Sequence, residues 1–198
     1  MQKQVGILAI QGAVEKHARA LERLGAAVHP VLRKEDLDGL QALVLPGGES
    51  TTISMGLERL GLYEPIQAFV ARGGAVLGTC AGAILLARQS RNHPVRTLGL
   101  LDAVAERNAY GTQLDSFIAP ADAAGPGEAT HPDFAGLECV FIRAPVLGEL
   151  GDGVEVLVRV DGRPVLVQQG RLLASTFHPE LTDDPRIHAR LLETCSET

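Results

Sequence analysis

A cysteine between two glycines, in Gly78-Thr79-Cys80-Ala81-Gly82, is the residue of this 198-residue sequence best placed to act as a nucleophile. An apolar run ends at Leu77, and a helix-like run follows at residues 83–87. The glycines allow a sharp turn from strand to helix, which presents the side chain between them at the carboxyl edge of a sheet. A helix N-terminus there favours the thiolate and offers N–H groups to an oxyanion. The alternative is an ordinary buried cysteine, which is common in protein cores.

A base and a carboxylate that would complete such a site lie in Ser175-Thr176-Phe177-His178-Pro179-Glu180. In an extended segment, residues two apart point to the same side, so His178 and Glu180 are expected to share a face. Glu180 would then bind one imidazole nitrogen while the other faces Cys80, which gives a Cys-His-Glu triad. By itself a His-Pro-Glu string is typical of a surface turn, and it gains weight only from the cysteine turn.

A third motif is Leu45-Pro46-Gly47-Gly48-Glu49-Ser50-Thr51-Thr52, at the end of an apolar strand-like run. Adjacent glycines can offer backbone N–H groups to the oxyanion of a tetrahedral intermediate, and they tolerate a peptide flip that would switch this oxyanion hole on or off. The alternative, compatible with the first, is a plain turn in which Ser50 or Thr51 caps a helix. A phosphate-binding loop is disfavoured because neither GxxxxGK[ST] nor GxGxxG occurs here.

These motifs belong to a set of six segments spread along the chain: residues 6–13, 45–52, 78–82, 106–108, 141–145 and 175–182. Together they resemble the class I glutamine amidotransferases, and within that family the glutaminase subunits of pyridoxal 5′-phosphate synthases. The cysteine turn and His-Pro-Glu occur throughout the family, whereas Gln-Gly-Ala, Gly-Gly-Glu-Ser-Thr-Thr, Arg-Asn and Phe-Ile-Arg-Ala-Pro single out the narrower group. Thr112 departs from the pattern, because the group usually has arginine there. The missing charge bears on a partner contact or a local salt bridge.

The resemblance implies a flavodoxin-like α/β fold and hydrolysis of L-glutamine to L-glutamate and ammonia. Cys80 would attack the side-chain amide to form a γ-glutamyl thioester. His178 would protonate the leaving ammonia and then activate water, with Glu180 orienting it. N–H groups at Gly48 and Ala81 would form the oxyanion hole. No cofactor and no metal are implied.

The resemblance also implies a set of glutamine-binding positions: Gly48, Glu49, Ser50, Arg107, Ile142 and Arg143. A ligand with an α-carboxylate suits a permanently charged guanidinium, which agrees with the two arginines. The alternative for either arginine is a solvated surface position or a pair with a structural carboxylate.

Ammonia released into water is mostly protonated and lost as a nucleophile, so a dedicated glutaminase makes sense docked to an acceptor enzyme. The resemblance supplies that partner, the synthase subunit of pyridoxal 5′-phosphate synthase, in a large hetero-oligomer. We expect the chain alone to be a weak glutaminase that the partner activates by ordering Gly47-Gly48. One alternative is a class I amidotransferase with another acceptor. A second is a redox sensor or binding module with the same cysteine turn, which would not need the His-Pro-Glu pair.

Composition bounds the remaining possibilities. With 198 residues, 45% of them hydrophobic, the chain can form one full core, and we expect a single domain over residues 1–198. A net charge of −6 without a Lys/Arg-rich run argues against nucleic-acid binding. No apolar stretch reaches the roughly 18 residues of a membrane span, and the N-terminus lacks the pattern of a signal peptide. A catalytic thiolate also needs a reducing compartment, so a cytoplasmic location is expected.

Hydrophobic patterning predicts an α/β fold with a mostly parallel sheet covered by helices on both faces. Strands are expected at residues 5–10, 28–32, 42–45, 75–77, 154–160, 165–168 and 172–175, a first helix at 13–24, and a surface loop at 119–136. Asp161-Gly162 and Gln169-Gly170 predict antiparallel hairpins in the C-terminal half.

The other histidines, His17, His29, His93, His131 and His188, show no metal-ligand spacing and are expected at the surface or satisfied by neighbours. His188, on the expected closing helix, is a candidate contact with the partner.

Overall fold

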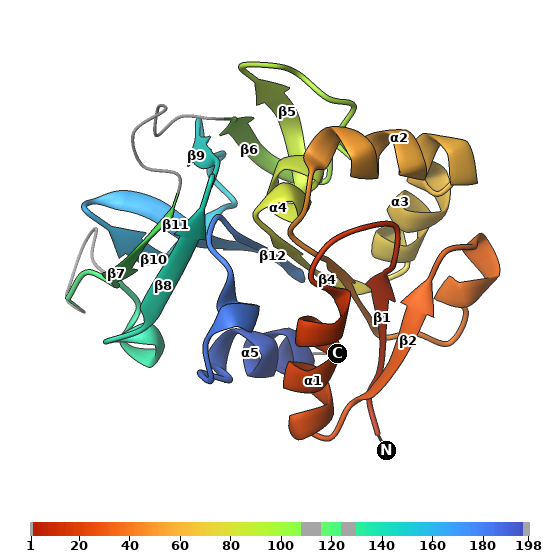
Figure 1. Ribbon diagram of the computed structural model, residues 1–198, viewed down its shortest axis with the longest axis horizontal. Helices are drawn as coiled ribbons and strands as arrows, with labels where there is room; N and C mark the ends of the chain where they lie inside the picture. Colours follow the sequence, from red (N-terminus) through yellow and green to blue (C-terminus); the bar gives the residue numbers. More distant parts are fainter. Residues whose placement is uncertain (1, 108–115, 124–129, 196–198) are drawn as a thin grey trace.

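A computed structural model describes residues 2–107, 116–123 and 130–195 of the chain. Seven strands form its central sheet: β1 (Gln4–Leu8), β2 (Ala27–Val31), β3 (Ala42–Leu45), β4 (Ala75–Thr79), β10 (Glu155–Val160), β11 (Arg163–Gln169) and β12 (Leu172–Ser175). Their order is β10-β11-β12-β4-β3-β1-β2 (Figure 1). All neighbours from β12 to β2 pair in parallel, whereas β10, β11 and β12 pair antiparallel. The predicted α/β class and the C-terminal hairpins are confirmed.

The hairpin turn between β10 and β11 shows why the sequence predicted it well. Asp161 and Gly162 both have positive φ, at 51° and 73°, which a two-residue hairpin turn of the I′ type requires. The strands expected at 42–45 and 172–175 have the observed bounds. The first strand ends earlier than expected, at Leu8, because residues 10–13 bend toward the first helix.

Helices cover both faces of the sheet, as predicted (Figure 1). α1 (Val14–Arg23) and α5 (Arg186–Thr194) pack on one face, and α2 (Ser50–Leu60), α3 (Tyr63–Ala71) and α4 (Ala81–Leu86) pack on the other. Strand β3 divides its side chains between the two cores: Leu43 and Leu45 face α2 and α3, whereas Ala42 and Val44 face α1 and α5. This alternation follows from the period of two in a strand.

Two small sheets accompany the central one. The first contains β5 (Ala87–Arg91), β6 (Leu101–Glu106) and β9 (Val146–Gly148), and the second contains β7 (Ser116–Pro120) and β8 (Glu138–Ile142). Short 3-10 helices, η1 (Lys34–Leu37), η2 (Pro132–Phe134) and η3 (Pro179–Leu181), complete the described elements. Part of the loop expected at 119–136 has regular structure instead, because β7 continues to Pro120 by pairing with β8 and residues 132–134 form η2. Residues 124–129 of that expected loop lie outside the described residues.

No helix in the described ranges combines the length and the apolar character that crossing a bilayer would need.

Candidate active site

Cys80 lies at the sharp turn between β4 and α4. Its backbone has φ 50° and ψ −102°, a conformation that costs a non-glycine residue about 1–3 kcal/mol and persists only where the surroundings hold it. The Cys80 N–H donates to the carbonyl of Ser175 at 2.8 Å, which helps to hold the turn. A Cβ at Gly82 would lie 1.9 Å from the Leu45 carbonyl oxygen, so only glycine lets α4 approach β3 this closely. The predicted strand-to-helix turn is present.

His178 and Glu180 reach the same place because β12 runs parallel to β4 and beside it. Ser175 and Thr79, near the ends of these strands, are register partners, so the chains continue side by side to His178 and Cys80. His178 Nδ1 lies 2.7 Å from Glu180 Oε1. The pair does not lie in an extended segment as predicted, because Pro179 starts the 3-10 helix η3. That turn still brings the imidazole and the carboxylate together.

The protonation of these groups follows from their contacts. Burial disfavours a charged imidazole, but the hydrogen bonds with Cys80 and Glu180 outweigh it and raise the pKa of His178 to about 10. With Nδ1 bonded to Glu180, Nε2 is the nitrogen left for Cys80. Burial also opposes the charge of Glu180, but the hydrogen bond with His178 outweighs it and lowers the pKa of Glu180. The arrangement therefore favours an imidazolium held between sulfur and carboxylate.

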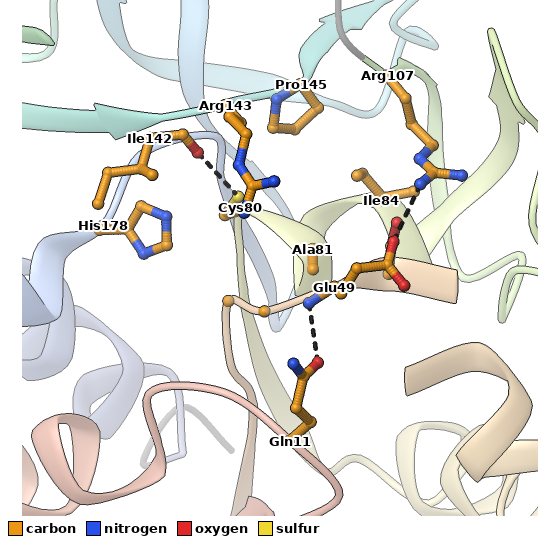
Figure 2. Close-up of a pocket in the computed structure, with 13 residues that line it drawn as sticks. Gln11, Glu49, Cys80, Ala81, Ile84, Arg107, Ile142, Arg143, Pro145 and His178 are labelled. Carbon is orange, nitrogen blue, oxygen red and sulfur yellow. Dashed lines mark hydrogen bonds and ion pairs between the residues drawn. The ribbon is translucent and has the colours of Figure 1, made fainter. Parts of the chain in front are cut away.

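A cavity of about 290 Å³ opens in front of Cys80 and His178 (Figure 2). Its lining includes every predicted binding and oxyanion position: Gly48, Glu49, Ser50, Ala81, Arg107, Ile142 and Arg143. Glu180 does not line it, because its side chain lies behind His178 and is 0% exposed. Gln11, Ile84 and Pro145 also line the cavity and were not predicted as site residues. Gln11 and Pro145 lie within two of the six family segments, so these motifs could have indicated that both residues line the cavity.

Glu49 has a structural task that the sequence did not predict. Its carboxylate accepts hydrogen bonds from the N–H groups of Thr51 and Thr52, at 3.2 and 2.8 Å, so Glu49 is the N-cap of α2. The expectation that Ser50 or Thr51 caps this helix is therefore wrong. Burial opposes the charge, but these hydrogen bonds outweigh it and lower the pKa of Glu49.

Arg107 follows β6 and extends over the cavity, where its Nη2 lies 3.2 Å from Glu49 Oε1 (Figure 2). The Arg107 guanidinium and the helix-capping carboxylate of Glu49 thus lie together on one wall. Arg107 therefore both pairs with a structural carboxylate and lines the cavity.

Ile142 and Arg143 form the opposite wall. The sulfur of Cys80 lies 3.8 Å from the Ile142 carbonyl oxygen, and Arg143 has a positive φ of 45°. This second strained residue beside the cavity turns the chain sharply at the end of β8.

The Gly47-Gly48 segment, called the oxyanion loop below, is held from two sides. The Gly47 N–H donates to Thr79 Oγ1 at 3.0 Å, and the Gly47 carbonyl accepts from the Ala13 N–H at 3.2 Å. In a trans peptide the N–H points opposite to the carbonyl, so the Gly48 N–H points away from Ala13. Ala81 begins α4, and its N–H has no acceptor within the helix.

Two of the histidines that were expected at the surface or satisfied by neighbours are buried beside the His178–Glu180 pair. His17 of α1 and His188 of α5 are 0% exposed and in contact, with His17 Nδ1 2.9 Å from His188 Nε2. The expectation that His188 touches a partner is therefore wrong, because α5 buries it against α1. No local motif marks these residues, since they are 171 positions apart.

Asn108 and Thr112 lie outside the described residues. Within the described residues, no group of three or more His, Cys, Asp or Glu side chains has an arrangement that could hold a metal ion.

Comparison with known proteins shows which family the chain resembles. A family model described as "SNO glutamine amidotransferase family" matches residues 7–197. Two relatives are named "Pyridoxal 5'-phosphate synthase subunit PdxT". One of them, from Thermus thermophilus, is 50% identical over 98% of this chain and 98% of its own. The other, from Deinococcus radiodurans, is 49% identical over 98% of this chain and 97% of its own.

Solved structures agree with this match. One described as "Crystal structure of glutamine amidotransferase" is 47% identical, with a TM-score of 0.87 and coverage of 98% of this chain and 99% of its own. The structure of PurLQS from Thermotoga maritima has a TM-score of 0.66 over 98% of this chain and 99% of its own. At 18% identity, that second likeness shows the fold alone. The family resemblance carried by the six sequence segments is confirmed.

Proposed function

The chain belongs to the SNO glutamine amidotransferase family, and from this we propose that it hydrolyses L-glutamine to L-glutamate and ammonia for a pyridoxal 5′-phosphate synthase. The observation that carries the proposal is the strained Cys80 turn beside the His178–Glu180 pair at one cavity. A thiol nucleophile, an imidazole and an orienting carboxylate are the groups that amide hydrolysis through a thioester requires.

The reaction begins when the Cys80 thiolate attacks the side-chain carbonyl carbon of glutamine. The N–H groups of Gly48 and Ala81 receive the oxyanion. The protonated His178 gives its proton to the departing amide nitrogen, which leaves as ammonia, and a γ-glutamyl thioester remains. His178, now neutral, takes a proton from water, and the resulting hydroxide releases glutamate and restores the thiolate. Glu180 keeps the imidazole oriented in both steps.

The amino-acid end of glutamine meets the rest of the lining. Arg107 and Arg143 supply the positive charge that an α-carboxylate needs. Gly48, Glu49, Ser50 and Ile142 complete the binding surface. Because the Glu49 carboxylate already caps α2 and pairs with Arg107, its contribution is to fix the guanidinium and the backbone beside the ligand.

The partner is the synthase subunit, in a hetero-oligomer located in the cytoplasm. Two relatives that match nearly the whole chain are named as subunits of pyridoxal 5′-phosphate synthase, which supports this acceptor over others. Docking would stimulate turnover by ordering the oxyanion loop.

The test is glutamate release from glutamine by the purified chain, alone and with the cognate synthase subunit. We expect weak turnover alone, stimulation by the synthase, and loss of both in Cys80→Ala. Cys195→Ala is the matched control, because this half-buried cysteine directly follows α5 and does not line the cavity. Equal turnover with and without the synthase would contradict the coupling. Absent turnover in both mixtures would contradict the glutaminase, and peroxide-dependent partner binding would then favour a redox sensor.

A further inference from the structure

A buried polar cluster lies behind the triad, outside the cavity. It consists of His17, Thr79 and His188, each 0% exposed, together with Glu180. His17 Nε2 lies 3.2 Å from Thr79 Oγ1 and 3.4 Å from Glu180 Oε2. Glu180 Oε2 is a buried oxygen with no hydrogen-bond donor among the described residues, and the ring nitrogen of His17 faces it. The cluster joins α1, β4, α5 and the segment after β12.

The contacts fix where the protons lie. A lone pair on His17 Nε2 would face the negative Glu180 oxygen, so Nε2 carries the hydrogen and Nδ1 is the acceptor. His188 must then donate its Nε2–H to His17 Nδ1. This leaves His188 Nδ1 as a bare acceptor, which agrees with its having no partner among the described residues. Both rings are neutral, because burial lowers the pKa of His17 and lowers that of His188 to about 3.

Thr79 connects this cluster to the other half of the catalytic apparatus. Its Oγ1 accepts the N–H of Gly47 at 3.0 Å as well as the N–H of His17. One hydroxyl therefore contacts both the oxyanion loop and the ring that faces Glu180. Thr79 directly precedes Cys80, so the connection runs beside the nucleophile without entering the cavity.

We propose that His17 and Thr79 are positioning residues that hold Glu180 and the oxyanion loop in register with Cys80, with His188 fixing the tautomer of His17. The proposal rests on the proposed glutaminase function. Its physical reason is that the base and the oxyanion hole act on the same tetrahedral intermediate, so their relative position matters as much as the position of each. A displacement of about 1 Å can cost a hundredfold in rate.

The kinetic test compares variants that keep or remove each contact, in the complex with the synthase subunit. His17→Gln keeps a donor near Nε2 and an acceptor for His188, whereas His17→Leu removes both. Thr79→Ser keeps the hydroxyl, whereas Thr79→Val removes it at equal volume. We expect His17→Leu and Thr79→Val each to lower kcat by about tenfold to a hundredfold with little change in KM, since substrate contacts are untouched. His17→Gln and Thr79→Ser should recover most of kcat.

The double variant shows whether His17 and Thr79 act on kcat together or independently. If His17 and Thr79 act together, His17→Leu combined with Thr79→Val lowers kcat about as much as the worse single variant. Fold-losses that multiply would overturn the proposal, as would full kcat in His17→Leu, or a folded His17→Gln as inactive as His17→Leu. If His17→Leu does not fold, the Thr79 pair decides. His29→Leu, the same change at an exposed histidine of β2, is the control and should keep wild-type kcat.

A readout without turnover separates this proposal from the proposed function. Imidazole ¹⁵N chemical shifts of the wild-type chain should show both His17 and His188 neutral and protonated at Nε2. Hydrogen exchange of the Gly47 amide should be faster in Thr79→Val than in Thr79→Ser. A proton on His17 Nδ1, or equal exchange in both Thr79 variants, would overturn the proposal even if glutamine is hydrolysed. Wild-type turnover that is absent while both signals hold would instead count against the glutaminase.

Discussion

At the scale of single residues, His178 interacts with Cys80 on one side and with Glu180 on the other, and both contacts favour its protonated form. The hydrogen bond between His178 and Glu180 also acts in both directions, because it raises the pKa of His178 and lowers the pKa of Glu180. On the cavity wall, the Glu49 carboxylate likewise has two partners. It forms the ion pair with Arg107 and it caps α2. The protonation states and positions of these side chains therefore depend on their contacts with neighbouring charged groups.

Replacing Cys80 by alanine should lower the pKa of His178 well below 10. The change removes the hydrogen bond and the negative charge of the sulfur, which raise this pKa. It leaves burial, which lowers the pKa, opposed by Glu180 alone. An NMR titration of the His178 imidazole measures the shift, with Cys195→Ala as a variant that should leave it unchanged. An unaltered His178 titration in Cys80→Ala would show that the sulfur does not interact with the ring.

At the scale of elements, the site depends on how closely α4 approaches the sheet. The helix is only six residues long, and it packs against β3 and β4. Gly82 permits that contact because any side chain there would overlap the Leu45 carbonyl. The same close approach carries Cys80 to the edge where β12 delivers His178.

Gly82→Ala should destabilise the chain and reduce turnover together. Moving α4 away from β3 costs about 1–3 kcal/mol, the usual range for overpacking a close contact, and the same movement displaces Cys80. Chemical denaturation measures the stability, and glutamate release measures the activity. Gly148→Ala is the matched control, because an added Cβ there meets nothing within 4 Å. Equal effects of the two substitutions would mean that the approach of α4 is not limiting.

At the scale of the whole molecule, the residues around the cavity come from segments that the sheet order brings together. β4 and β12 are neighbours although distant in sequence, and the small sheets add Arg107 and Arg143 from either side. The buried histidines add a link between the helices on one face of the sheet. The organisation of residues 1–198 as a single domain remains a prediction.

The buried imidazoles should give the chain its greatest stability near pH 6.5, the ordinary pKa of histidine. His178 has a raised pKa of about 10, so its contribution is complete below pH 6.5 and is lost as the pH rises toward 10. His188 has a lowered pKa of about 3, so its contribution is complete above pH 6.5 and is lost as the pH falls toward 3. The lowered pKa of Glu180 adds to the loss in acid.

Free energies of unfolding measured across this pH range check the prediction. His188→Leu should be less stable overall but should lose less stability on acidification, because it has no neutral imidazole to protonate on unfolding. Cys80→Ala should flatten the alkaline limb by lowering the pKa of His178. An acid limb of unchanged slope in His188→Leu would show that His188 is not held neutral.

The features that depend on local backbone preference could be predicted from the amino-acid sequence. Glycines around Cys80 encode the sharp turn, Asp161-Gly162 encodes a hairpin, and short apolar runs such as residues 42–45 encode buried strands. Each of these features depends on a few consecutive residues, so it can be predicted from a local sequence pattern. The family motifs likewise indicated which residues would line the cavity.

The contacts between side chains that are far apart in the sequence became visible with the folded chain. Glu49 caps α2 and meets Arg107, 58 positions away, and His17 meets His188 behind Glu180. The 3-10 turn at Pro179, in place of the expected extended segment, is a further case. Such contacts depend on strand register and on the packing of helices against the sheet, which no local sequence pattern specifies. For the same reason, the residues around a histidine do not indicate whether it is buried with a partner or exposed to solvent.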